Sequence, residues 1–173
     1  MNKTLVSWSI LAILILALLG IWWQHSFARP ILCTLRGCVT TSSLAKEKTY
    51  AQSFARLTNA DTPPEQSILT TLIRIHLLKA FGNTSISENE AVKYRTSVLH
   101  LTDEQTIRPI GFSSFQEYDD SVTIPFLMQE AYAKEHNLTT SDDVYASLAK
   151  QHRVVSLLFR YAWDSSKGEA VAR

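Results

Sequence analysis

Apolar positions are distributed along this chain in two different ways. Between Thr4 and Trp23 they form one run without a charged residue or a proline. From residue 44 onward they recur at the three- to four-residue spacing of helices that bury one face. No segment alternates apolar and polar residues convincingly with a period of two. The pattern therefore predicts an all-α fold, with one apolar N-terminal helix followed by a compact domain of five to six helices.

The N-terminal run has the length and the ending of a membrane-spanning helix. Twenty helical residues rise about 30 Å, which matches the hydrocarbon core of a bilayer. Trp22 and Trp23 close the run, and their amphipathic rings suit the interface between membrane and water. We therefore predict a single-pass transmembrane anchor, with membrane lipid as one partner of the protein.

Two other interpretations of the run remain open. A cleaved signal peptide is one, because Lys3 gives a positive leader and residues 26–28 fit a small-x-small cleavage sequence, although the run exceeds a usual h-region. A helix buried in a soluble domain is the other. Positive charge flanks the run almost equally, with Lys3 before it and Arg29 and Arg36 after it. The short leader favours an N-terminus in the cytoplasm, which would anchor the protein in the inner membrane with its domain in the periplasm.

Start and stop signals divide the remainder of the chain. Residues 63–81 are apolar around most of the helix circumference, so this helix is predicted to be the centre of the core. Pro125 must kink or split the helix that follows residue 113, and Thr140 caps a last long helix that the apolar pattern extends to Trp163. The predicted divisions are a leader at 1–3, the anchor at 4–23, a connector at 24–43, a helical domain at 44–163 and a flexible polar tail at 164–173.

The two cysteines, Cys33 and Cys38, both lie in the predicted connector. Outside the cytoplasm such a pair can oxidise to a structural disulfide. Free thiols are the main alternative. Redox or metal chemistry fits less well, because redox motifs more often read C-x-x-C and a structural zinc site needs four ligands.

Charge and motif content exclude several classes of function. Lys and Arg total 17 against 16 Asp and Glu, and there is no basic stripe or arm, so nucleic acid is not an expected partner. None of the five histidines has metal-ligand spacing to another. Catalytic serine motifs and Gly-rich phosphate loops are missing as well. We therefore expect no catalytic residue, no metal, no cofactor and no small-molecule substrate, and an enzyme is the least favoured hypothesis.

Three signals follow one another in a characteristic order. The apolar helix LTTLIRIHLLKAFG is followed by the Ser87–Glu90 capping box, and then by a helix that begins near Gly111 and contains Pro125. Over residues 65–160 this order resembles the N-terminal helical chaperone region of SurA-like periplasmic folding factors and membrane-anchored parvulin-type isomerases. The V-N-G strand and the parvulin domain of that family have no counterpart, so isomerase activity is not implied.

The resemblance implies a SurA-like domain that holds an apolar segment of another polypeptide, either an unfolded protein or a membrane protein. Aromatic side chains in helical domains belong more often to the core, and a binding groove needs several of them exposed in one patch. A second hypothesis is an accessory or structural subunit of a membrane protein complex, which would dock through its anchor and its helical domain. The candidate contact residues are Phe112, Phe115, Tyr118, Phe126 and Tyr132.

Overall fold

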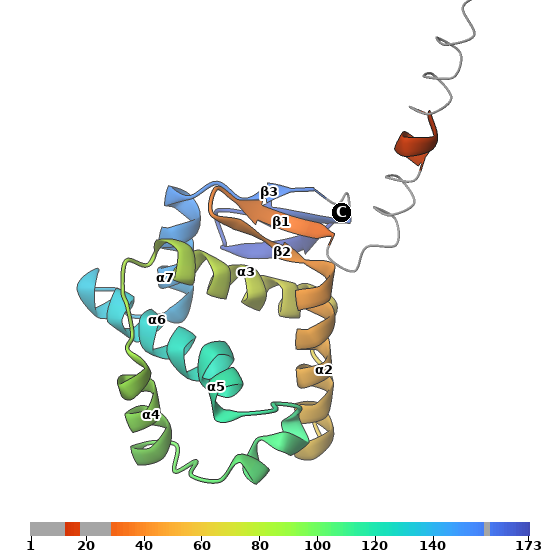
Figure 1. Cartoon of the computed structure of the whole chain (residues 1–173). Coiled ribbons are helices and arrows are strands. Elements are labelled where there is room, and N and C mark those ends of the chain that lie inside the picture. The colour runs from red at the N-terminus through yellow and green to blue at the C-terminus, as the bar shows by residue number, and fades with distance from the viewer. Residues whose placement is uncertain (1–12, 18–28, 158–159) are drawn as a thin grey trace, which may run out of the picture.

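The computed structural model describes residues 13–17, 29–157 and 160–173 (Figure 1). Residues 13–17 are helical, and 3₁₀ turns occur at Glu104–Thr106 and Arg108–Ile110. The strands are β1 Pro30–Thr34, β2 Gly37–Thr40, β3 Val155–Ser156, β4 Tyr161–Asp164 and β5 Glu169–Ala172. The longer helices are α2 Thr41–Thr58, α3 Glu65–Phe81, α4 Glu88–Ser97, α5 Phe115–Tyr118, α6 Ile124–Glu135 and α7 Ser141–Gln151, with a π-helical turn at Asp119–Thr123.

The prediction of an all-α fold is wrong, because the expected connector contains a β-hairpin. β1 and β2 pair antiparallel and β3 adds to the other edge of β1, giving the strand order β2-β1-β3. Ile31, Leu32 and Val39 are buried, whereas Leu35 at the turn is exposed. β1 has only five residues and β2 only four. So short a segment shows too few alternations for a period of two to stand out.

The predicted end of the last helix and the flexible tail are also corrected. Helix α7 stops at Gln151, and the chain then forms β3 and the antiparallel β4–β5 hairpin. This hairpin is fixed to α3, because the Ala170 amide donates to Thr70 Oγ1 at 2.9 Å and Arg74 Nε donates to the Gly168 carbonyl at 2.9 Å. Long-range hydrogen bonds therefore order a segment whose polar composition suggested fraying.

The predicted transmembrane anchor has to be corrected. Only residues 13–17 of the 4–23 run are described, and the rest, with Trp22 and Trp23, lies outside the described residues. No helix within the described ranges has the length and apolar character needed to cross a membrane. A span needs about 20 mostly apolar residues, whereas α3 has 17 and includes Arg74 and Lys79. The described residues thus contain no transmembrane helix, against the prediction of a single-pass inner-membrane protein with a periplasmic domain.

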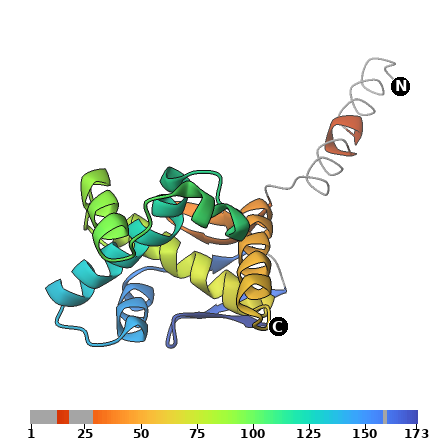
Figure 2. The same ribbon diagram turned by 90° about the horizontal axis from the view of Figure 1, so that it is seen from below.

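Helix α3 lies at the centre of the core, as its apolar pattern predicts. Figure 2 shows it crossing the middle of the molecule, with α2 at one end and the β4–β5 hairpin beside it. It contacts α2, α6, α7, β2 and β5. Its fully or almost fully buried side chains are Ile68, Leu69, Ile73, Leu77 and Leu78.

A π-helical turn immediately precedes Pro125 in the helix that this proline was expected to kink or split. The Ile124 amide bonds to the Asp119 carbonyl, five residues back, immediately before the proline. Because Pro125 has no N–H to donate, a regular α-helical ladder cannot continue through it, and the wider turn accommodates the change. Residues 115–135 therefore form one helical run whose two halves face different neighbours.

Candidate functional site

A groove of about 530 Å³ lies between α2 and a later part of the chain, and we call it the α2 groove. Three segments line it: one face of α2, the segment that returns from α2 to α3, and the stretch from Ile110 to the π-helical turn. In Figure 1 this later stretch lies beside the end of α2 that is farther from the strands. The lining residues are Glu47, Tyr50, Ala51, Phe54, Ala55, Ala60, Asp61, Pro63, Ile110, Phe112, Tyr118 and Val122.

The apolar stripe of α2 is covered at one end and open at the other. Tyr50, Phe54 and Leu57 recur at i, i+4 and i+7, so they share one helix face. Tyr50 is buried and stacks on Phe112 with ring centroids 4.3 Å apart. Phe54 and Leu57 are 54% and 57% exposed. Among the described residues, two neighbouring apolar side chains of this stripe are therefore open to solvent.

The carboxylate of Glu117 holds the two walls of the groove together. It accepts hydrogen bonds from the Tyr50 hydroxyl of α2 at 2.8 Å and from the Ser113 amide at 2.7 Å. Lys46 Nζ lies 2.6 Å from the same carboxylate. A hydrogen bond from Lys46, followed by hydrogen bonds from Ser113 and Tyr50, holds the pKa of Glu117 well below its usual value. The charged form of Glu117 is therefore part of the groove's structure.

Protonation of Glu117 should loosen the groove walls at acidic pH. Because the pKa is lower in the folded state, the stabilisation is complete above the ordinary value of 4.5 and is lost as the pH falls through the folded-state pKa. The Glu117→Gln variant should be less stable at pH 7 by roughly 1 kcal/mol. The difference between the two proteins should shrink toward pH 3, as measured by urea unfolding across that range. A difference that is constant with pH would contradict this role.

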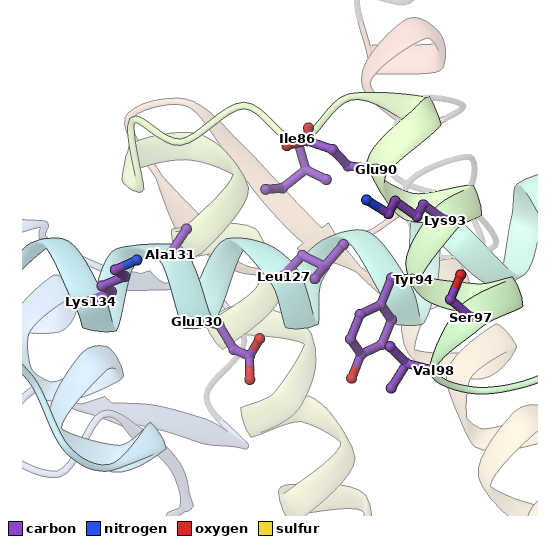
Figure 3. Close-up of a pocket in the computed structure, with 10 residues that line it drawn as sticks. All are labelled: Ile86, Glu90, Lys93, Tyr94, Ser97, Val98, Leu127, Glu130, Ala131 and Lys134. Atoms are coloured by element: carbon purple, nitrogen blue, oxygen red, sulfur yellow. The ribbon is translucent and has the colours of Figure 1, made fainter.

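A second groove, of about 430 Å³, lies between α4 and α6, and we call it the α4–α6 groove. Figure 3 shows Tyr94 and Val98 from the α4 side beside Leu127 of α6. Charges of both signs surround these apolar residues. The charged lining residues are Glu90, Lys93, Glu130 and Lys134.

Of the five predicted contact residues, Phe112, Phe115 and Tyr118 belong to one hydrophobic cluster, and the other two lie elsewhere. Phe112 and Tyr118 line the α2 groove. Phe115 lies under the Arg95 guanidinium, 3.7 Å from its ring centroid. Phe126 is 39% exposed and its ring lies 5.5 Å from that of Tyr94 in the α4–α6 groove. Tyr132 is buried in the main core. These five side chains therefore do not form one contact surface.

Sequence reasoning missed the part of the site contributed by α2. The signal was present, because Tyr50, Phe54 and Leu57 have helical spacing, but the same spacing is typical of a helix face that the core covers completely. The position of Glu47 three residues before Tyr50 places its carboxylate on the same helix face. Which of these residues stay uncovered depends on the stretch 110–122, and no local pattern in the sequence pairs that stretch with α2.

Several polar groups lie between the β1–β2 hairpin and the C-terminal half of α3. Cys33 and Cys38 are directly opposite each other in the β1–β2 hairpin and form a disulfide, with their Cα atoms 4.0 Å apart. His76 Nε2 lies 3.0 Å from Thr34 Oγ1, and burial lowers the pKa of this histidine. Arg36 donates to the carbonyl of Ala80 in the last turn of α3. These groups join the hairpin to the end of the helix.

Within the described ranges, no group of three or more His, Cys, Asp or Glu side chains is placed to hold a metal ion. Comparisons with protein-family models, with curated proteins and with solved structures find no match to this chain.

Proposed function

We propose that this chain is a non-catalytic polypeptide-binding protein that holds an apolar segment of another protein in the α2 groove. The observation that carries the proposal is the half-uncovered stripe of α2, where Phe54 and Leu57 are exposed beside a groove of about 530 Å³. Burying such side chains against a ligand removes apolar surface from water, at about 25 cal/mol per Å². The binding energy would come mainly from this burial.

The shape of the apolar surface favours a polypeptide ligand. Glu47 and Phe54 both line the groove and are seven residues apart in one helix, so this wall of the groove is about 10 Å long. Val122 is 40% exposed on the opposite wall and extends the apolar surface across the groove. An elongated, open groove lined by one helix face suits a segment that presents apolar side chains at helical spacing. The resemblance of residues 65–160 to the SurA-like region supports the same class of ligand.

A charge placed in the groove should abolish binding without unfolding the protein. In the Phe54→Asp and Val122→Asp variants, a carboxylate replaces an exposed apolar contact, so peptide affinity should fall at least about ten-fold. The measurement is fluorescence anisotropy with the purified full chain and labelled peptides that carry apolar residues at helical spacing. Aggregation of an unfolded apolar protein, followed by light scattering, should be suppressed by the wild type and not by these variants.

The matched control is Val98→Asp in the α4–α6 groove. Val98 is 56% exposed, comparable with Phe54, so the new charge has the same access to solvent. This variant should bind peptides as the wild type does, and thermal melting should show that all three variants fold. Equal loss of affinity in all three, or unchanged affinity after Phe54→Asp and Val122→Asp, would refute the α2 groove as the binding site.

A further inference from the structure

The charged residues that line the α2 groove are all of one sign. Glu47 and Asp61 carry carboxylates, and the described residues of the lining include no lysine or arginine. The α4–α6 groove, by contrast, is lined by two acidic and two basic residues. Charge thus distinguishes two grooves that are otherwise similar in size and apolar character. An apolar groove with acidic residues at its edge attracts ligands that carry positive charge.

Glu47 is the one of these two carboxylates that lies on the stripe of α2. It precedes Tyr50 and Ala51 by one helical turn and Phe54 by two, so all four side chains share one face. The distance from Glu47 to Phe54 along the helix axis is about 10 Å. A bound segment that covers Phe54 and follows the groove past Ala51 would therefore reach the carboxylate.

The lysines beside Glu47 in the sequence are already engaged elsewhere. Lys46 pairs with Glu117 at 2.6 Å, and Lys48 pairs with Glu65 at 2.7 Å. Among the described residues, the structure records no hydrogen bond or salt bridge to the Glu47 side chain. Burial raises the pKa of Glu47, with the charge of Lys46 opposing that rise. A half-buried carboxylate without a paired cation is stabilised when a ligand supplies one.

We propose that the α2 groove selects apolar segments that carry a lysine or arginine about two helical turns from their main apolar anchor, with the cation paired to Glu47. This inference rests on the proposed function, because it assigns the ligand class of the same groove. The apolar side chains of the segment cover Phe54 and Val122, while its ammonium or guanidinium group reaches the Glu47 carboxylate. The pair is partly shielded from water, so it adds affinity as well as orientation.

Three peptides and three proteins test this assignment. The peptides share one apolar sequence and differ only at the charged position, which holds lysine, norleucine or glutamate. The proteins are the full-length wild type, Glu47→Gln and, as the matched control, Glu130→Gln at the α4–α6 groove. For the wild type and the control, the lysine peptide should bind about ten-fold more tightly than the norleucine peptide, and the glutamate peptide should bind least tightly. In Glu47→Gln the lysine and norleucine peptides should bind alike.

Different results would refute the cation selectivity and the peptide-binding function. If lysine and norleucine peptides bind the wild type equally, or if Glu47→Gln weakens all three peptides by the same factor, the cation selectivity is wrong while the groove remains a peptide site. If no peptide binds, or if Phe54→Asp binds the norleucine peptide as tightly as the wild type, the proposed function itself is wrong. The preference for lysine should also diminish between low and high salt, because a partly exposed ion pair is screened.

Discussion

Replacing Arg95 by leucine should lower the free energy of unfolding by about 3–5 kcal/mol. Arg95 and Asp119 are 6% and 5% exposed, and Arg95 Nε donates to both carboxylate oxygens at 3.1 and 3.0 Å. Arg95 also donates to the Leu101 carbonyl at 3.0 Å. Without the guanidinium, the Asp119 carboxylate stays buried with the Thr123 hydroxyl as its recorded donor, at 2.9 Å. One neutral donor does not compensate a buried charge.

The double variant Arg95→Leu/Asp119→Leu separates an unpaired charge from lost packing. It removes both charges, so it should be destabilised by clearly less than the sum of the two single variants. The matched control is Arg160→Leu, which removes an exposed partner of Glu65 at 3.7 Å and should cost between about 0 and 1 kcal/mol. Urea unfolding of the full chain measures all four. Additive losses, or an Arg95→Leu cost as small as that of Arg160→Leu, would show that this pair is not a stabilising centre.

The Arg95–Asp119 pair also connects stability with the α2 groove. Asp119 opens the π-helical turn, and the residue before it, Tyr118, lines the groove. Phe115, one turn earlier, lies against the Arg95 guanidinium. The polar pair therefore fixes the helical run that forms one wall, in the same way that Glu117 fixes that wall to Tyr50. Glu117 and Asp119 are two residues apart, and they bind Tyr50 and Arg95 on opposite sides of one short helix.

Local signals in the sequence predicted the parts of the fold that depend on local chemistry. The capping boxes at Ser87–Glu90 and Thr140–Asp143 are both present, because each needs only four consecutive residues. The central position of α3 followed from apolar residues around most of its circumference. The strands were missed for two reasons. The β1–β2 and β4–β5 hairpins are local, but each of their strands has only four or five residues. β3 has two residues and pairs with β1, which lies near the other end of the described chain, so its own sequence does not reveal the pairing.

The candidate site was predicted only in part for the same reason. Phe112 and Tyr118 were selected from the sequence, and both line the α2 groove. Their counterparts Tyr50, Phe54 and Glu47 lie about sixty residues earlier. The bond that brings the two stretches together joins Tyr50 to Glu117, and a capping or charge pattern within either stretch does not reveal it. Exposure of Phe54 is a property of the assembled fold, since the same spacing would also serve a fully covered helix.

Replacing Leu77 by alanine should lower the free energy of unfolding by about 2–5 kcal/mol. Leu77 is fully buried in α3, the helix that contacts α2, α6, α7, β2 and β5, so the lost methyl groups leave a cavity that none of these elements is free to fill. In a chain of this length the melting temperature should fall by roughly 4–20 °C. The matched control is Leu57→Ala at a 57% exposed position of α2, which should change stability by less than about 0.5 kcal/mol. Similar losses of stability at the two leucines would contradict α3 as the centre of the core.

The pair of variants also separates stability from peptide binding. Leu57→Ala should weaken peptide binding at nearly full stability, whereas Leu77→Ala should leave the affinity of the folded fraction unchanged.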